Sequence, residues 1–418
     1  MAFLNGGYIM TKMKLMLYGL VFICFMDLFV QLPVMGPLAK SLGAGSFVTG
    51  LAVGLYSLTN MFGNLAAGIW IDRVGGKIVL ITGFICTACV LLMYLLVNDP
   101  IYLLIVRFVH GLAGGLLVPS AFTLISKFAS KGSGEGKAMA LSGAAVGLAA
   151  IVGPAAAGIL KARVGLDLLF LYTAVLLFIG ALIALIWAPR DDRSVMKQIQ
   201  HINSNKLKQP AEQQQASFTS IFNNKPVIQS YIGAFSLMFA MGALTYALPL
   251  KADQLSFPDQ TAGLLLSTFG IVAILVFVLP VNKLFDRVPP LKLIFIGGLF
   301  VVISLLLLSL LRDKLSMYIV MGFYGLGFAL LFPSLNALLI RNVTPENKGK
   351  AFGLFYAFFS IGVVAGSSGL SALSGYYDDV LRLAGAIIFI AGIGVCMWHK
   401  LEKQKKRDYD YERQETQL

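Results

Sequence analysis

LLIVRFVHGLAGGLLVPSAFTLISK, residues 103–127, is the stretch of sequence that decides the fold. It is long and apolar enough to cross a bilayer, for which a helix needs roughly 20 apolar residues, yet it contains Arg107. Its latter part, GLAGGLLVPS at residues 111–120, returns 214 positions later as GLGFALLFPS at residues 325–334. The stretch therefore predicts a membrane-spanning helix and an internal duplication of the chain.

The composition of the whole chain agrees with a membrane protein. Hydrophobic residues make up 58% of the 418 residues and charged residues 13%, and the mean hydropathy is +0.81, which excludes an ordinary soluble surface. Only helices and closed barrels satisfy every backbone hydrogen bond in lipid. We therefore expect an all-α membrane protein with twelve transmembrane helices. The apolar stretches lie at residues 14–36, 46–71, 78–97, 100–127, 137–160, 166–188, 226–250, 259–282, 291–311, 316–340, 351–375 and 380–399.

The duplication predicts two pseudo-symmetric six-helix bundles at residues 1–188 and 226–399. A parallel repeat of six spans is typical of transporters that place a substrate site between their halves. Residues 189–225 are polar and rich in Gln, Asn, Ser and Lys, so they cannot bury a core and are expected to form a cytoplasmic linker. Residues 400–418 are expected to form a charged cytoplasmic tail.

The distribution of basic residues predicts the topology. Of the 33 Lys and Arg, 25 lie at the N-terminus, in alternate loops, in the linker and in the tail, whereas seven lie in the opposite loops. The positive-inside rule then places both termini in the cytoplasm of a multi-pass protein of the inner (plasma) membrane. The net charge of +13 is explained by topology and by attraction to anionic membrane lipids, so we expect no nucleic-acid partner. We expect a monomer.

Two ionisable residues, Asp27 and Arg107, lie well within the predicted spans. A charge at the centre of a bilayer helix costs roughly 2.5 to 3.5 kcal/mol on insertion scales, so both are expected to be functional. Counting the helical rise from each end places both roughly 10 Å below the outer surface. If they meet, Arg107 would keep Asp27 ionised, and their separation would favour proton uptake. The alternative is that the pair only joins two helices.

His110 follows Arg107 by three residues and is the sole histidine deep within a predicted span. An imidazole can titrate near neutral pH. A proton-coupling role is therefore one interpretation, and a polar contact inside the bundle is the other. The sequence shows no nucleophile triad and no metal-ligand spacing. We accordingly expect no enzyme, metal or cofactor, and a proton gradient as the energy source.

Two motifs resemble the major facilitator superfamily. Residues 68–77, GIWIDRVGGK, match its loop motif G-x-x-x-D-R-x-G-R-K at most positions, with Gly76 in place of a basic residue. Arg107-Phe-Val-His-Gly-Leu-Ala-Gly-Gly resembles the motif R-x-x-Q-G-x-G-A-A of its drug:proton antiporters, with His110 where Gln is usual and Ala113 at a glycine position. The resemblance covers the whole chain and implies the twelve-helix fold of that superfamily.

The resemblance also assigns a conformational latch and an exporter motif. The latch residues break and remake contacts between the inward and outward states; they are Gly68, Asp72, Arg73, Gly75 and Lys77. A topological anchor with a tight turn is the alternative for this loop. The motif at Gly153, Pro154 and Gly158 resembles the antiporter signature G-x-x-x-G-P-x-x-G-G and favours outward transport, although close helix packing is sufficient to explain it.

The substrate cavity is expected between the two halves. The family's cavity-lining spans nominate Gln31, Tyr231, Phe235, Phe239, Tyr246, Phe323, Tyr324 and Asn336, and the second span adds Asn60 and Asn64. A pocket with many aromatic residues and few charges suits a small amphipathic molecule.

Together these features predict a secondary active transporter that exports small amphipathic compounds against protons by alternating access. An importer or symporter of an anionic metabolite that uses Arg107, a lipid flippase and a sensor that transports nothing are the alternatives. The repeat keeps the glycines and Pro333-Ser334, but Met321 stands where Arg107 would align. Coupling is therefore expected in the N-terminal half.

Overall fold

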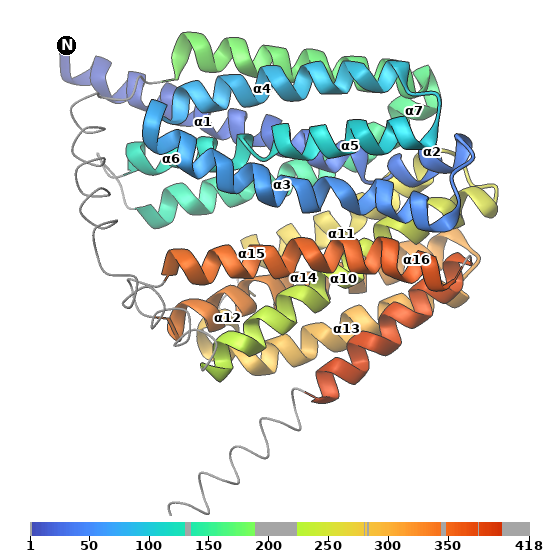
Figure 1. The fold of residues 1–418 in the computed structure, drawn as a ribbon. Coiled ribbons are helices and arrows are strands. Elements are labelled where there is room, and N and C mark those ends of the chain that lie inside the picture. The colour runs from blue at the N-terminus through green and yellow to red at the C-terminus, as the bar shows by residue number, and fades with distance from the viewer. Residues whose placement is uncertain are drawn as a thin grey trace, which may run out of the picture.

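The computed structural model describes residues 2–129, 135–188, 224–279, 281, 284–343, 348–374 and 376–394, and this part of the chain is helical with no strand (Figure 1). The predicted tail and all of the predicted linker but residues 224–225 lie outside it. The helices are α1 (Ala2–Gln31), α2 (Met35–Ser41), α3 (Ser46–Val74), α4 (Gly76–Met93), the 3-10 turn η1 (Tyr94–Leu96), α5 (Pro100–Gly114), α6 (Leu117–Ala129), α7 (Glu135–Trp187), α10 (Lys225–Gln254), α11 (Gln260–Val278), α12 (Leu284–Arg287), α13 (Pro290–Leu310), α14 (Lys314–Arg341), α15 (Lys348–Val364), the π-helical turn η4 (Ala365–Gly369), α16 (Leu370–Leu373) and a last helix at residues 377–394.

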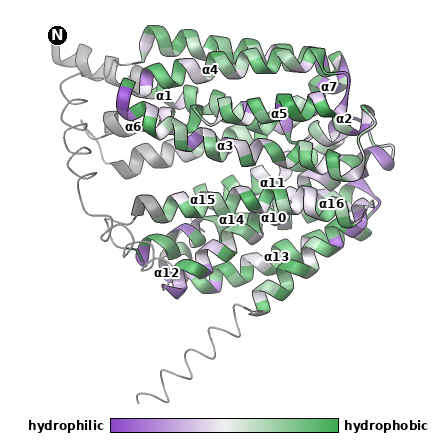
Figure 2. Cartoon of the chain, viewed as in Figure 1, coloured by the Kyte–Doolittle hydropathy of each residue, from purple (hydrophilic) through white to green (hydrophobic). Residues whose placement is uncertain are grey.

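Eight helices of the described part are long and apolar enough to cross a membrane, or nine if the bent pair α1–α2 is counted as one span. The middle parts of these helices are hydrophobic, and their ends are more hydrophilic (Figure 2). The helix α7 counts once, although it passes through Gly165 with the non-helical angles φ 84° and ψ 177° and contains two of the predicted stretches. The helix α3 is not among the eight. The number twelve is therefore not confirmed.

Two of the predicted continuous spans are broken. The first bends by 41° between α1 and α2, across residues 32–34, where Pro33 has no backbone N–H to donate. The opening stretch of the sequence forms α5 and α6, separated by a turn at Gly115 and Leu116. Its repeat in the second half stays within one continuous helix, α14.

Buried apolar side chains form two main clusters. One is drawn from residues 17–188 and the other from residues 227–388, and we call these two parts the N-terminal and C-terminal halves. In Figure 1 the helices α1 to α7 lie above α10 to α16. Each half thus has its own core, as expected for a duplicated chain.

The two halves meet unevenly along α3. A Cβ added to Gly50 would lie 2.3 Å from the Ser367 carbonyl oxygen, so the first turns of α3 press directly on η4. Near the other end of α3, Gly68 has no atom within 4 Å of its Cβ position and Ile69 is 61% exposed. Figure 1 shows α2 and α16 at the same end of the molecule, the end where α3 begins. We call this the α2–α16 end and the opposite one the Gly75 end.

Candidate functional site

A cluster of polar side chains lies in the interior of the N-terminal half. Its members come from α1, α3 and α5, and each is less than 9% exposed. They are Asp27, Gln31, Tyr56, Arg107 and His110. Unpaired polar groups are costly in an apolar interior, so the hydrogen bonds among these residues decide what the cluster can do.

Three side chains approach the Asp27 carboxylate with groups that can donate a hydrogen bond. Gln31 Nε2 donates to Oδ1 over 2.9 Å, and Tyr56 Oη donates to Oδ2 over 3.2 Å. His110 Nε2 lies 3.1 Å from Oδ1. An ionised carboxylate only accepts hydrogen bonds, so this is the arrangement that its charged form requires.

His110 lies between Asp27 and a tyrosine that had not been predicted. Its Nδ1 is 3.0 Å from Tyr94 Oη, which comes from the 3-10 turn η1. The rings of Tyr56 and Tyr94 both meet the imidazole edge-on, at centroid distances of 5.1 and 5.5 Å. With one ring nitrogen toward a carboxylate and the other toward a hydroxyl, His110 can hold or pass on a proton without leaving its place.

The hydrogen bonds of the Arg107 side chain go to groups other than the Asp27 carboxylate. Its Nε donates to the Ala52 carbonyl over 2.7 Å, its Nη2 to the Val53 carbonyl over 3.1 Å, and its Nη1 to Gln31 Oε1. The guanidinium also lies 5.0 Å from the centre of the Tyr56 ring. The predicted neighbourhood of Asp27 and Arg107 is present, but Gln31 stands between them and His110 makes the direct contact with the carboxylate.

Glycines in the opening stretch bring α5 close enough to α3 for these contacts. A Cβ on Gly111 would lie 1.9 Å from Thr59 Oγ1, and one on Gly115 would lie 2.6 Å from the Asn60 carbonyl oxygen. Any larger side chain would push the two helices apart. The glycines next to His110 therefore set the distance between the imidazole and Tyr56.

Sequence reasoning missed two members of the site. Tyr56 precedes the predicted Asn60 by four residues and so lies on the same face of α3, which was an available signal. Tyr94 lies at the end of an apolar helix, and no spacing connects it with His110. Its partner is determined by tertiary packing, in which its ring also stacks on Phe170 at 4.6 Å.

The residues predicted to line a cavity lie in different environments. Gln31 belongs to the buried cluster described above. Asn64 Nδ2 donates to Asn60 Oδ1 over 3.0 Å, while Asn64 Oδ1 has no hydrogen-bond partner within the described part of the chain. Asn336 donates to the Phe332 carbonyl of its own helix over 2.8 Å.

Among the predicted aromatic residues, three lie along α10 next to α15. Tyr231 stacks on Phe358 at 5.3 Å and donates to the Ala351 carbonyl, and Phe235 stacks on Phe239 at 5.8 Å.

The other predicted rings are spread over the C-terminal half. Tyr246 contacts Tyr377 edge-on at the α2–α16 end. Phe323 is 43% exposed and stacks on Phe300 of α13. Tyr324 is fully buried against Phe269 inside the C-terminal half.

A chain of aromatic contacts that was only partly predicted joins α14 and α15. Phe332 stacks on Phe328 at 5.9 Å and meets Phe359 edge-on at 6.3 Å. Phe359 continues to Phe355 and Tyr356 at 6.3 and 5.9 Å. The C-terminal half therefore contains a continuous set of aromatic contacts between α14 and α15.

The predicted latch residues lie at the Gly75 end. Gly75 turns the chain between α3 and α4 with φ 92°, a backbone angle that glycine adopts without strain. Lys77 Nζ donates to the carbonyls of Leu185 and Ala188 at the end of α7, over 2.8 and 2.6 Å, and so caps that helix.

Asp72 and Arg73 are exposed at the same end. The side chain of Lys127, a basic residue near the end of α6 that could pair with Asp72, lies outside the described residues.

The predicted exporter motif lies on α7, which packs there against α1 of its own half and against α11 of the C-terminal half. A Cβ on Gly153 would lie 2.6 Å from Phe29 Cβ, and one on Gly158 would lie 2.9 Å from the Gln260 carbonyl oxygen. The Pro154 carbonyl oxygen would lie 2.0 Å from a Cβ on Gly263. The motif thus allows close packing between the two halves.

Comparison with known proteins places this geometry in a family. The family model of the Major Facilitator Superfamily matches residues 17–367, and a second match covers residues 230–415. The chain is 26% identical over 392 residues to multidrug resistance protein MdtG of Escherichia coli O9:H4 (strain HS), covering 91% of this chain and 90% of the relative. It is 27% identical over 379 residues to the MdtG of Klebsiella pneumoniae (strain 342), covering 88% and 86%.

Solved structures show the same fold at low sequence identity. The nucleoside transporter NupG superposes with a TM-score of 0.74 at 16% identity, covering 93% of this chain and 99% of that one. A POT family transporter in complex with a peptide conjugate gives a TM-score of 0.73 at 11% identity, covering 93% and 96%. With a family model matching most of its length, the chain belongs to the major facilitator superfamily.

Proposed function

We propose that this protein is a drug-efflux transporter that exports small amphipathic compounds in exchange for protons. Relatives named multidrug resistance proteins match 91% of the chain, which supports efflux over the other functions considered. The apolar helices and the family support a multi-pass protein of the inner membrane. The excess of basic residues in alternate loops supports cytoplasmic termini.

The observation that carries proton coupling is the buried carboxylate of Asp27. It is 0% exposed and surrounded by donors from three other residues. A carboxylate inside a bilayer is stable only where such partners compensate its charge. A rearrangement that removes one donor therefore favours proton uptake, and restoring that donor favours proton release. This is how a change of conformation would move a proton through the site.

Alternating access is supported by the uneven contact between the halves. The α2–α16 end is tightly packed at Gly50, whereas toward the Gly75 end of α3 no described atom lies within 4 Å of the Gly68 Cβ position and Ile69 is 61% exposed. With cytoplasmic termini, the Gly75 end faces the cytoplasm and this conformation is inward-facing. We propose residues 1–188 and 226–399 as the two bundles that rock against each other, with the loop at Gly75 as a latch between states.

The proposed substrate surface consists of the rings on α10, α14 and α15 together with Asn60 and Asn64 of α3. Aromatic faces bind amphipathic and cationic compounds without a strict shape requirement. Asn64 Oδ1 is buried and has no partner among the described residues, and it would accept a hydrogen bond from a substrate once the surface around it opens. No cofactor is required, since ion gradients drive transport in this family.

Import of an anion through Arg107 is disfavoured by the contacts of that side chain. The guanidinium is 3% exposed, and its three nitrogens already donate to protein oxygens. A substrate carboxylate would have to displace Gln31 or a backbone carbonyl. Efflux driven by protons therefore remains the function that fits the site.

Transport in everted membrane vesicles tests the proposal. Ethidium and other amphipathic dyes are offered outside the vesicles, and uptake is measured with and without an imposed proton gradient. We expect gradient-driven uptake by the wild type and its loss in Asp27→Asn. The matched control is Asp259→Asn, which removes an exposed carboxylate paired with Lys161 at 3.2 Å. Gradient-driven uptake by Asp27→Asn at the wild-type rate would remove Asp27 as the coupling site.

A further inference from the structure

The side chain of Gln31 connects the proton site to a charged residue of another helix. Its Nε2 donates to Asp27 Oδ1 over 2.9 Å and to the Asp27 carbonyl over 2.8 Å, while its Oε1 accepts from Arg107 Nη1. The residue is 3% exposed. Both ends of the amide are therefore engaged inside the protein, which leaves little of it for a substrate.

Gln31 is also the last residue of α1, immediately before the 41° bend. The backbone N–H of Val34 donates to the Gln31 carbonyl over 3.2 Å, so the bend starts from this residue. The short helix α2 follows and packs against α10, where a Cβ on Gly36 would lie 3.6 Å from both the Tyr246 carbonyl oxygen and the Leu250 side chain. A shift of Gln31 thus has a direct path to α2.

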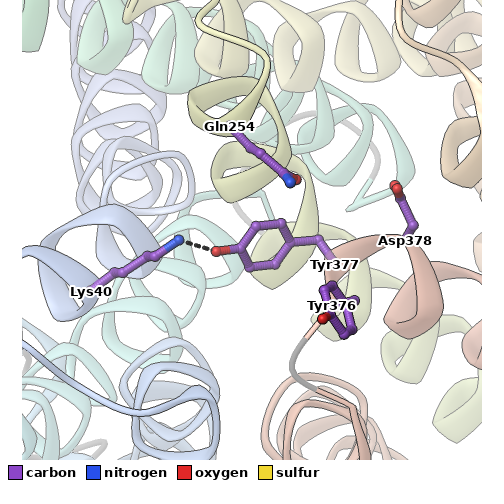
Figure 3. Close-up of a pocket in the computed structure, with 5 residues that line it drawn as sticks. All are labelled: Lys40, Gln254, Tyr376, Tyr377 and Asp378. Carbon is purple, nitrogen blue, oxygen red and sulfur yellow. Dashed lines mark hydrogen bonds between the residues drawn. The ribbon is translucent and has the colours of Figure 1, made fainter.

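The far end of α2 closes the contact between the halves. Lys40 Nζ donates to Tyr377 Oη, and the ammonium lies 4.9 Å from the centre of the same ring (Figure 3). The two residues lie at a small pocket of about 220 Å³ that is also lined by Gln254, Tyr376 and Asp378. We call the contact of Lys40 with Tyr377 the outer clasp.

The acceptor side of the outer clasp is held in place by a charge cluster. Asp378 follows Tyr377 and accepts hydrogen bonds from Lys251 Nζ over 2.7 Å and from Arg312 Nη2 over 2.6 Å. Lys251 Nζ also donates to the Leu308 carbonyl over 2.5 Å. Asp378 is held from two sides, and this limits the movement of its neighbour Tyr377. The contact between Lys40 and Tyr377 is therefore expected to change mainly when α2 moves.

We propose that Gln31 is a positioning residue that transmits the protonation of Asp27 to the outer clasp through the bend and α2. This inference rests on the proposed proton coupling. Proton uptake by Asp27 removes the charge that Gln31 and Arg107 hold between them, and the amide then loses its strongest acceptor. The bend at residues 32–34 then changes and α2 shifts along α10, so the contact of Lys40 with Tyr377 depends on whether Asp27 is protonated.

The groups that face Asp27 allow this response. Tyr56 faces it from α3, His110 from α5 and Cys24 from its own helix, and Tyr94 of η1 contacts His110. The helix α7 presents Gly153 and Gly180 to α1, and α6 contributes buried Leu117 and Ala121 to the same core. His110 is the other ionisable side chain that contacts the Asp27 carboxylate. Among these described groups only Gln31 lies at the end of α1, where the bend toward α2 begins.

The test measures the opening of the α2–α16 end as a function of pH. Spin labels on Ser41→Cys of α2 and Leu373→Cys of α16 report the distance across the end by pulsed electron resonance, after replacement of the native cysteines in the full-length protein in lipid nanodiscs. In the otherwise unmodified protein we expect the ratio of the short-distance and long-distance populations to change with pH. In Gln31→Met the pH-dependent change in the ratio of the two populations should fall about tenfold, because a hydrogen bond to a charged group is lost.

Two controls separate the transmission from a loss of structure. Gln229→Met makes the same exchange at another buried position, 5% exposed in α10, and should keep the full pH response. Lys40→Met removes the outer clasp and should raise the long-distance population at every pH while keeping a response. If Gln31→Met does not fold, Gln31→Asn replaces it, because the shorter amide cannot reach both Asp27 and Arg107.

The outcomes distinguish this inference from the proposed function. If the distance between the two labels changes with pH equally in Gln31→Met and in Gln229→Met, the role of Gln31 is overturned, while proton coupling stays intact. A distance that does not change with pH in the otherwise unmodified protein overturns the transmission to the outer clasp, and a pH response that persists in Asp27→Asn contradicts Asp27 as its source.

Discussion

The two halves of the molecule carry the same framework with opposite chemistry. An offset of 214 positions relates the polar cluster to its counterparts in the C-terminal half. Asp27 corresponds to Met241, Gln31 to Thr245, Arg107 to Met321 and His110 to Tyr324.

The contacts are repeated as well as the positions. Tyr324 Oη lies 3.9 Å from Met241 Sδ, where His110 contacts Asp27, and Thr245 Oγ1 donates to the Met241 carbonyl over 2.8 Å, as Gln31 does to that of Asp27. Duplication thus preserved the packing, while at these positions only the N-terminal copy holds ionisable groups such as a carboxylate, an imidazole and a guanidinium. The difference teaches that a fold repeat does not imply a repeat of function.

Placing a charge in the uncharged copy should have the largest effect on stability. Met321 is 0% exposed, so Met321→Arg would bury a guanidinium in a site that offers thioether and hydroxyl groups instead of a carboxylate. We expect a loss of roughly 2.5 to 3.5 kcal/mol, measured as a lower midpoint of thermal unfolding in detergent. Met321→Leu is the control and should cost less than about 1.5 kcal/mol. A fully stable, active Met321→Arg would show that the two copies are interchangeable.

Making the charged copy resemble the uncharged one should abolish pH sensitivity at a smaller cost in stability. His110→Tyr introduces the residue found at Tyr324 and removes the imidazole between Asp27 and Tyr94. We expect efflux to fall about tenfold, the effect of losing one hydrogen bond to a charged group, and its dependence on pH to flatten because the imidazole is gone. Tyr324→Phe is the counterpart and should leave the pH profile of efflux unchanged.

Glycine substitutions test whether the packing really is duplicated. A Cβ would lie 1.9 Å from Thr59 Oγ1 at Gly111 and 2.6 Å from the Phe269 carbonyl oxygen at Gly325. Both Gly111→Ala and Gly325→Ala should therefore destabilise the protein, by roughly 1 to 3 kcal/mol each. Gly298→Ala, with no atom within 4 Å, is the control. Unfolding midpoints that differ strongly between the first two variants would contradict equal packing in the halves.

The smallest effect is expected from the charge cluster of the C-terminal half. Burial raises the pKa of Asp378, but hydrogen bonds from Lys251 and Arg312 outweigh it and hold the pKa below its ordinary value of 3.8. The stabilisation is therefore present at neutral pH and is lost as pH falls below about 3.8. Asp378→Asn should lower the unfolding midpoint by about 2 to 4 °C at neutral pH, and the difference from wild type should disappear in acid, once the carboxyl is protonated. A difference that persists there would assign the effect to packing.

The fold could be predicted from the sequence further than the site could. The repeated decapeptide and the composition predict a duplicated helical membrane protein, because both are properties of the chain alone. The breaks after Gln31 and at Gly115 were not predicted: the first lies at Pro33, which the sequence places within an apolar stretch, and the second depends on the close approach of Gly115 to α3. Equal depth in the bilayer brought Asp27 and Arg107 into one neighbourhood, but the side chain between them depends on rotamers and on the close approach at Gly111.

The aromatic surface illustrates the same limit. Phe323 and Tyr324 are adjacent in a helix and so point about 100° apart, which means that both cannot line one cavity in the same way. In the structure the first is 43% exposed and the second fully buried. Choosing between neighbouring rings requires knowledge of which helix packs against which face.

Proton release on substrate binding tests the central claim most directly. The dye that vesicles transport best is added to purified, weakly buffered protein near neutral pH, and the protons released are counted with a pH indicator. We predict that the wild type and Met241→Leu release protons on binding, while Asp27→Asn binds the dye and releases none. Equal proton release by Asp27→Asn and the wild type would contradict the account, because coupling would then lie outside the charged cluster of the N-terminal half.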